Sequence, residues 1–347
     1  MEWKNGVVTT IDQTKLPKKL VFLKMKGYRQ VASAIREMKI RGAPLIGVAA
    51  AYALALTAFH SKAETKGDLI KEIEESAGFL KETRPTAVNL FWAIDRITNK
   101  ARKTIGTAKD VTKVVVDEAN KMADEDVEAN RKMGAYGSTL LNDGDVILTH
   151  CNAGSLATVD YGTALGVVRV AWEQGKKIRV IATETRPKLQ GARLTAYELQ
   201  REGIPVTLIA DSMVGYVMQE RRVNKVIVGA DRIVRDAVIN KIGTFGIAVL
   251  SHEHEIPFYV AAPTSTFDST HSASEVVIEQ RDPEEVTHFG TQQIAPNGVK
   301  AFNPAFDITP MRYVRAIICE TGILSPKDFE RRANRNHKTK KDLRRDG

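Results

Sequence analysis

Short apolar runs rich in valine and isoleucine recur about every 20 to 30 residues in the second part of the chain. Five such runs are DVILTH, KIRVIAT, PVTLIAD, NKVIVGAD and PFYVAAP. Segments of helical length separate them, such as residues 189–202, 212–219 and 240–251. Strands that alternate with helices at this spacing predict βαβ units and therefore a parallel sheet.

The first part of the chain has a mostly helical pattern. We predict a few short strands within the first 25 residues. The helices that we predict after them cover Tyr28–Met38, Pro44–His60, Lys66–Glu82, Ala87–Thr104 and 108–141. The predicted fold class is α/β, with a parallel sheet in the larger C-terminal domain and a smaller, mostly helical N-terminal domain. We assign residues 1–125 to the N-terminal domain, 126–330 to the catalytic domain and 331–347 to a basic, flexible tail.

The composition is that of an ordinary globular protein, with 43% hydrophobic and 27% charged residues. The longest apolar run, Ile46–Phe59, is shorter than a membrane span, so we interpret it as a buried helix. The opening residues carry no secretory signal, and the two cysteines, Cys151 and Cys319, are far apart. These features favour a reducing, cytoplasmic location without disulfides and argue against a membrane partner.

The net charge of +9 is concentrated at the C-terminal end. Residues 331–347 contribute +6, which leaves +3 for the rest of the chain. We interpret this tail as a solvated terminus, because no aromatic residues are interleaved with its basic ones. A nucleic-acid partner is therefore not expected.

Polar residues at the ends of predicted strands supply candidate chemistry. Cys151 follows the strand DVILTH and Asp231 follows NKVIVGAD, so both side chains are expected at one edge of the sheet. We expect Cys151 at a phosphate-binding floor, next to a helix opened by small residues. Asn240 and Lys241 are expected to open the helix after the Asp231 loop. Taken singly, a buried structural cysteine and a helix-capping aspartate are the alternatives.

Two N-terminal segments carry groups suited to an anion. Arg41 and Gly42 precede Pro44 at the start of a predicted helix, and Arg84 precedes Pro85 in the same way. A surface salt bridge is the alternative for each arginine. The chain has no Walker loop, zinc-ligand spacing or GxGxxG fingerprint, which disfavours a dinucleotide enzyme and a metal site.

Several of these segments together resemble one enzyme family. RGAPLIGVAAAYALAL, RPTAVNLFWAIDR, THCNAGSLATVDYGTALGVV, TRPKLQGARLTAYEL, VIVGADRIVRDAVINKIGTF and PFYVAAPTSTFD occur in the order found in methylthioribose-1-phosphate isomerases of methionine salvage. The resemblance covers about residues 1–330. It implies a Rossmann-like C-terminal domain, a homodimer, a sugar-phosphate substrate and no cofactor. It also implies catalysis by Cys151 and Asp231, and substrate binding by Arg41, Gly42, Ala43, Arg84, Gln190, Asn240 and Lys241.

An aldose 1-phosphate is a locked acetal, so its ring must open before hydrogen moves from C2 to C1. Asp231 is the candidate acid and Cys151 the candidate proton-transfer group. The sequence leaves open whether the hydrogen moves through an enediol or as a hydride. Two other functions also stay open, namely a ribose-1,5-bisphosphate isomerase and a non-catalytic regulatory subunit of a translation initiation exchange factor.

Overall fold

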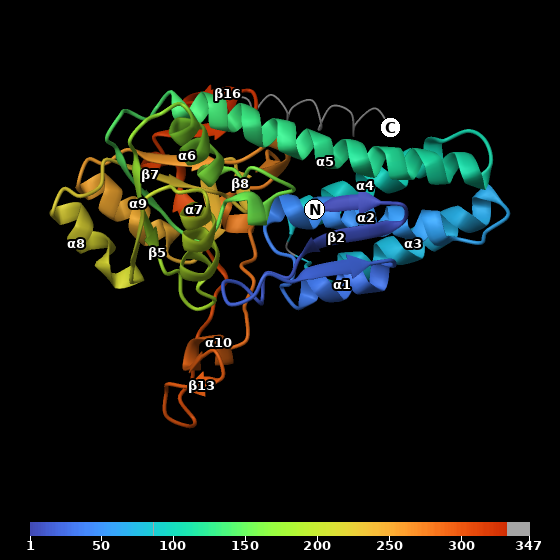
Figure 1. Cartoon of the computed structure of the whole chain (residues 1–347), viewed down its shortest axis with the longest axis horizontal. Coiled ribbons are helices and arrows are strands. Elements are labelled where there is room, and N and C mark those ends of the chain that lie inside the picture. The colour runs from blue at the N-terminus through green and yellow to red at the C-terminus, as the bar shows by residue number, and fades with distance from the viewer. Residues whose placement is uncertain (86, 332–347) are drawn as a thin grey trace. The chain divides into compact units, whose positions relative to one another are not determined.

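The computed structural model describes residues 1–85 and 87–331, which form two compact units. The first unit contains residues 1–130 and 154–162, and the second contains residues 131–153 and the described residues from 163 onward. The domain boundary predicted after residue 125 lies inside the helix α5 (Ala108–Ser138), which continues without a break from one unit into the other (Figure 1). Apart from Arg331, the predicted tail of residues 331–347 lies outside the described residues.

The first unit consists of one small sheet and a group of helices. Its strands β1 (Glu2–Lys4), β2 (Val7–Ile11) and β3 (Phe22–Met25) pair antiparallel in that order. Its helices are α1 (Tyr28–Arg36), α2 (Ala43–His60), α3 (Lys66–Lys81), α4 (Val88–Lys103) and most of α5. The start of α3 is capped by Thr65, whose hydroxyl accepts the backbone N–H of Asp68 at 3.1 Å.

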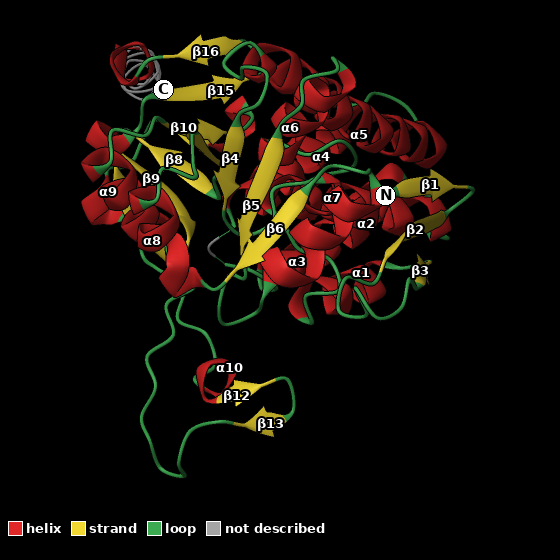
Figure 2. Ribbon diagram, turned by 60° about the vertical axis from the view of Figure 1, so that its left-hand side comes forward, coloured by secondary structure: helices red, strands yellow, loops and turns green. Residues whose placement is uncertain are grey.

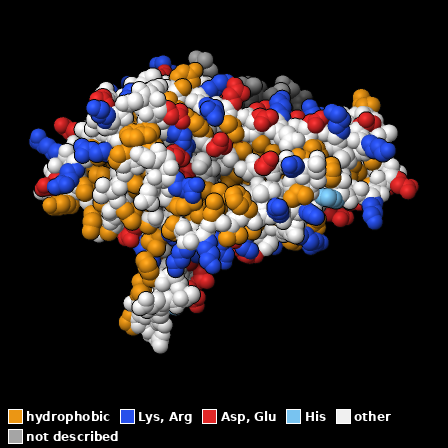
Figure 3. All heavy atoms as spheres, viewed as in Figure 1, with side chains coloured by type: hydrophobic (Ala, Val, Ile, Leu, Met, Phe, Trp, Pro, Cys, Tyr) orange, Lys and Arg blue, Asp and Glu red, His pale blue; other side chains and the backbone are white. Residues whose placement is uncertain are grey.

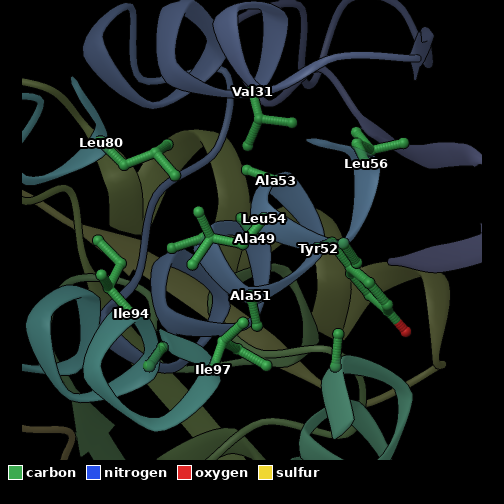
Figure 4. Close-up of a cluster of buried hydrophobic side chains, with 14 of the residues drawn as sticks. Val31, Ala49, Ala51, Tyr52, Ala53, Leu54, Leu56, Leu80, Ile94 and Ile97 are labelled. Atoms are coloured by element: carbon green, nitrogen blue, oxygen red, sulfur yellow. The ribbon is translucent and has the colours of Figure 1, made fainter. Parts of the chain in front are cut away.

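Helix α2 is the centre of the first unit's core. It is apolar on all sides, and it packs against α1, α3 and α4, so it is buried rather than amphipathic. Figure 4 shows Leu54 and Ala49 of this helix among Val31, Leu80 and Ile94. By length and composition α2 could cross a membrane, but 72% of it is buried inside the fold. The interpretation of residues 46–59 as a buried helix is confirmed.

The second unit is built on a seven-stranded sheet with the order β16-β15-β10-β7-β4-β5-β6. Its strands are β4 (Val146–Thr149), β5 (Arg179–Thr183), β6 (Val206–Ile209), β7 (Lys225–Val228), β10 (Phe258–Ala261), β15 (Ala316–Cys319) and β16 (Gly322–Leu324). All pairs are parallel except β15 with β16. The five predicted strands are β10, β7, β4, β5 and β6, of which β6 lies at one edge of the sheet, and the α/β fold class is confirmed.

Helices cover both faces of this sheet. Helices α6 (Ala164–Glu173) and α7 (Ala196–Arg201) lie on one side, and α8 (Val214–Gln219) and α9 (Thr244–Glu253) lie on the other (Figure 2). Successive strand residues alternate between the two cores: Ile147 packs with the α6 side and Leu148 with the α8 side. Strands that are buried on both faces are continuous apolar runs, which is why the sequence predicts them well.

A second, four-stranded sheet was not predicted. Its order is β11 (Phe267–Asp268), β8 (Arg232–Val234), β9 (Ala237–Lys241) and β14 (Phe306–Pro310). The prediction that Asn240 and Lys241 open a helix is wrong, because both residues end β9 and α9 begins at Thr244. Pairing with β14 along the whole of β9 holds these residues in a strand.

The second unit also carries a projecting arm. Helix α10 (Glu284–Thr287) and the strand pair β12 (His288–Phe289) and β13 (Gln292–Gln293) extend away from its main sheet (Figures 1 and 2). On the face drawn in Figure 3, basic and acidic side chains are interspersed. This distribution agrees with the small net charge outside the C-terminal tail.

Candidate active site

The order in which strands are added to the main sheet reverses between β4 and β7. Strands β5 and β6 extend the sheet on one side of β4, whereas β7, β10 and β15 extend it on the other. Cys151 follows the end of β4 at Thr149, and Asp231 follows the end of β7 at Val228. Both residues therefore leave adjacent parallel strands at the carboxyl edge, where open α/β sheets bind their ligands.

The backbone of Cys151 is held in an unusual conformation. Its φ is 63°, in the left-handed region that non-glycine residues rarely adopt. The Cys151 N–H donates to Thr185 Oγ1 at 2.9 Å, and the Cys151 carbonyl accepts from Thr195 Oγ1 at 2.7 Å. Strained backbone of this kind persists where surrounding contacts fix it, and it is common at functional sites. The thiol is half-buried and forms no disulfide.

No long helix starts directly after the Cys151 loop. The small residues predicted to open one form a loop with a short 3-10 turn, Ser155–Ala157, and α6 begins only at Ala164. The expectation of a helix N-terminus immediately following Cys151 is wrong. Residues 154–162 instead belong to the first unit, where the N–H of Val159 donates to Asp126 at 2.8 Å.

Asp231 lies at the entrance of the hairpin formed by β8 and β9. Its side chain is half-buried, and its N–H donates to the carbonyl of Ile239 at 3.0 Å. This hydrogen bond places Asp231 opposite the end of β9, the strand that carries Asn240 and Lys241. The second unit therefore gathers three of the predicted site residues around one hairpin.

Asn240 and Lys241 are nearly inaccessible. The amide of Asn240 donates to Thr244 Oγ1 at 3.0 Å, which fixes its orientation. Lys241 is 8% exposed; its Nζ donates to the carbonyl of Ala305 at 2.6 Å and lies 4.9 Å from the centre of the Phe306 ring. Burying an ammonium group is costly unless anionic or dipolar groups surround it. An anionic ligand would be a suitable partner.

Asp307 contributes a carboxyl group beside this lysine. It pairs with Asn240 across β14 and β9, and its Oδ2 accepts the N–H groups of Gly243 and Phe245 at 2.7 and 3.1 Å. Burial raises the pKa of Asp307 to about 6, although these hydrogen bonds and the charge of Lys241 oppose the rise. The sequence analysis did not select Asp307. A carboxylate between the strand-forming residues of AFDITP would have been the feature that pointed to it.

Gln190 presents a buried amide. It is 3% exposed, and among the described residues its Oε1 accepts no hydrogen bond. A π-helical turn, Gly191–Thr195, follows it directly, and such turns are frequent at functional sites. A Cβ on Gly191 would lie 1.7 Å from the carbonyl oxygen of Thr183, so this turn packs directly on the end of β5. The free acceptor could receive a ligand hydroxyl.

The first unit holds Arg41, Gly42 and Ala43 at the start of α2. Arg41 is 7% exposed, and its Nε donates to Gln13 Oε1 at 3.0 Å, while Gln13 Nε2 donates to the carbonyl of Leu156 at 2.6 Å. Gly42 has φ 100°, and a Cβ there would lie 2.4 Å from the carbonyl oxygen of Ala157. Packing on residues 154–162 therefore fixes this segment. Ala43 is the first residue of α2.

Arg84 is half-buried in the turn between α3 and α4, where its carbonyl accepts the N–H of Ala87 at 3.0 Å. The helix α4 begins at Val88, one residue after the predicted start at Ala87, so Pro85 precedes the helix and does not lie in its first turn as Pro44 does in α2. Among the described residues, no three His, Cys, Asp or Glu side chains are grouped closely enough to hold a metal ion.

Comparison with known proteins identifies the family. The profile of the initiation factor 2 subunit family matches residues 39–326. The chain belongs to this family. A curated member from Archaeoglobus fulgidus, named putative methylthioribose-1-phosphate isomerase, is 55% identical over 93% of this chain and 95% of its own. One from Desulforamulus reducens, named methylthioribose-1-phosphate isomerase, is 52% identical over 93% and 94%.

Solved structures of this family carry two kinds of name. A 5-methylthioribose 1-phosphate isomerase from Pyrococcus horikoshii has 47% identity and a TM-score of 0.89, over 96% of this chain and 94% of its own. A chain from A. fulgidus described as translation initiation factor eIF-2B, subunit delta, has 54% identity and a TM-score of 0.83, over 93% and 96%. Sequence identity alone therefore does not decide between an isomerase and an initiation-factor subunit.

Two further members of the site were missed by the sequence reasoning. Thr185 has φ 63°, an outlier for a β-branched residue, and its N–H donates to Asp211 at 2.8 Å. Asp211 also accepts the N–H of Arg186 at 2.6 Å. These residues follow the ends of β5 and β6, so the strand-end rule that selects Cys151 and Asp231 would also have selected them.

Proposed function

We propose that this chain is an aldose-ketose isomerase that converts 5-methylthioribose 1-phosphate to 5-methylthioribulose 1-phosphate. The observation that carries the proposal is the similarity to relatives of that name, at 50–55% identity over 93–94% of this chain. The pair Cys151 and Asp231 at the switch point of the sheet supports it, because a purely regulatory subunit needs no such pair.

We assign the ring-opening step to Asp231. Its carboxyl group protonates the ring oxygen, so that the bond between this oxygen and C1 breaks. Cys151, as the thiolate, then takes a proton from C2 and returns it to C1, while the C2 hydroxyl gives its proton to the Asp231 carboxylate and becomes the ketone. Direct hydride transfer from C2 to C1 gives the same product, and in that route Cys151 would not carry the hydrogen. No atom is gained or lost overall, and the proposal includes no cofactor.

We assign substrate binding to Arg41, Gly42, Ala43, Arg84, Gln190, Asn240 and Lys241. The ammonium group of Lys241 and the guanidinium groups of Arg41 and Arg84 suit a phosphate dianion. Among the described residues, the Oε1 of Gln190 accepts no hydrogen bond, so it suits a sugar hydroxyl. We expect apolar side chains around the methylthio group, because a charged wall there would favour a 5-phosphate instead.

A coupled assay that offers both sugar phosphates tests the proposal. Turnover of the methylthio sugar supports it. Turnover of ribose 1,5-bisphosphate alone would identify the bisphosphate isomerase, and no turnover of either would favour the regulatory subunit. Cys151→Ser and Asp231→Asn should each lower kcat by orders of magnitude, whereas Cys319→Ala should not. Normal turnover in either of the first two variants would remove the corresponding role.

The assembly is part of the same proposal: a cytoplasmic homodimer with a Rossmann-like second unit. Helices cover both faces of its sheet, and α8 and α9 expose Tyr216, Phe245 and Val249 to 61%, 39% and 37%. Exposed apolar side chains on neighbouring helices are typical of an interface. Light scattering on a chain ending at Glu330 should still give an active dimer; a monomer would show that the tail is needed for assembly.

A further inference from the structure

His150 directly precedes Cys151 and connects three segments of the second unit. The residue is 2% exposed. Its Nδ1 lies 2.7 Å from Thr183 Oγ1, at the end of β5, and its Nε2 lies 2.8 Å from the carbonyl oxygen of Ile242, the residue after Lys241. These contacts span 33 and 92 positions in the sequence. The imidazole therefore lies between the Cys151 loop and the segment that carries Lys241.

When the His150 ring is neutral, the hydrogen bonds around it run in one direction. A carbonyl oxygen only accepts, so Nε2 must carry the hydrogen that bonds Ile242. Burial lowers the pKa of His150, and the neutral ring then has an unprotonated Nδ1 that accepts from the Thr183 hydroxyl. Thr183 has then used its only hydrogen, so its Oγ1 can only accept at the 3.2 Å contact with Thr185. The Thr185 hydroxyl is the donor on this side, and it also lies 3.3 Å from the Thr183 carbonyl oxygen. Thr185 Oγ1 in turn accepts the Cys151 N–H.

The chain of bonds is enclosed on all sides. Thr183 and Thr185 are both 0% exposed, and a Cβ on Gly243 would lie 3.0 Å from Cε1 and Nε2 of the imidazole. The charged groups that act on His150 are Asp211 and Lys241, and the positive charge of Lys241 opposes protonation of the ring. The other neutral tautomer, with the hydrogen on Nδ1, would set the Nε2 lone pair against the carbonyl oxygen of Ile242, and two buried acceptors facing each other are costly.

We propose that His150 is a positioning residue: through Thr183 and Thr185 it fixes the backbone of Cys151, and through Ile242 it fixes the segment of Lys241. The inference rests on the proposed function, because it assigns His150 to the Cys151 and Lys241 of that site. One neutral imidazole thereby holds the proton-transfer group and the anion-binding ammonium in a constant arrangement. Neither the thiol nor the substrate needs to touch it.

Two matched variants of Thr183 separate positioning from packing. Thr183→Val keeps the shape but removes the hydroxyl, and Thr183→Ser keeps the hydroxyl. We expect Thr183→Val to lower kcat about tenfold or more with KM changed less than about threefold, and Thr183→Ser to keep kcat within about threefold. His150→Asn retains an acceptor for Thr183 but loses the donor to Ile242, so KM should rise about tenfold.

Thr266→Val is the control, because this threonine is 0% exposed and its hydroxyl has no partner among the described residues. It should leave kcat and KM unchanged. Equal losses in Thr183→Val and Thr183→Ser, or a lower melting temperature of Thr183→Val with normal kcat, would overturn the inference and leave His150 a structural residue only.

Two measurements on the folded chain do not depend on turnover, so they remain decisive if the proposed substrate is wrong. Nitrogen-15 NMR of histidine-labelled protein should show His150 as the neutral Nε2–H tautomer between pH 6 and pH 8; an imidazolium or the other tautomer would overturn the direction of the bonds. In a Cys319→Ala background, Thr183→Val should change the rate of Cys151 alkylation by iodoacetamide at least about threefold. An unchanged rate would contradict positioning of the thiol.

Discussion

Replacing Asp307 by asparagine should remove a pH-dependent part of the stability of the second unit. The pKa of this carboxyl is raised from 3.8 to about 6 by burial. A raised carboxyl pKa means that the folded state binds the proton more tightly than the unfolded chain does. The stabilising contribution is therefore fully present below pH 3.8 and is lost as the pH rises through 6.

The size of the effect follows from these two pKa values. Between pH 8 and pH 5, the linkage relation gives a gain of about 1.4 kcal/mol in the free energy of unfolding, or about tenfold in the equilibrium constant. The difference in stability between the wild type and Asp307→Asn should change by this amount over that interval, with the wild type favoured at the lower pH. Other titrating groups cancel in the difference.

Urea unfolding followed by tryptophan fluorescence measures this difference. In a background with Trp3→Phe and Trp92→Phe, the remaining Trp172 lies in α6 and reports on the second unit. Asp307→Ala is the control for lost hydrogen bonds, since it removes the acceptor for Gly243 and Phe245 at every pH. Parallel stability profiles of wild type and Asp307→Asn between pH 5 and pH 8 would refute the reasoning.

Two further substitutions have matched controls. Gly42→Ala should destabilise the first unit by about 1–3 kcal/mol, because its φ is 100° and backbone atoms of Ala157 occupy the space. Gly78→Ala, in α3 with nothing within 4 Å, should stabilise this unit by about 0.5–1 kcal/mol. Urea unfolding in a Trp172→Phe background, which keeps Trp3 and Trp92 in the first unit, measures both changes. Lys225→Met should cost about 3–5 kcal/mol, since it leaves Asp145 buried without its ion pair, whereas Lys113→Met breaks an exposed pair worth about 0.3–0.5 kcal/mol. Equal effects of Gly42→Ala and Gly78→Ala would contradict the close packing of Gly42 on Ala157. Equal effects of Lys225→Met and Lys113→Met would contradict the argument from burial of the Lys225–Asp145 pair.

The sequence by itself determined the elements whose residues all face one kind of environment. Strand β4 is recognisable because both of its faces are buried, so its residues form an unbroken apolar run. Helix α2 is recognisable for the same reason, and Pro44 marks its start. The strand-end rule selects Cys151 and Asp231 from the sequence alone.

The tertiary structure alone decided how those elements meet. Asn240 and Lys241 lie in a strand because β14, more than sixty positions further along the chain, pairs with β9. No local pattern encodes that partner, since strand pairing depends on contacts between distant residues. The orientation of His150 likewise depends on Ile242, 92 positions away, and on burial that leaves its ring neutral. Local sequence sets which residues can form a strand end, whereas long-range packing sets which strand ends share one site.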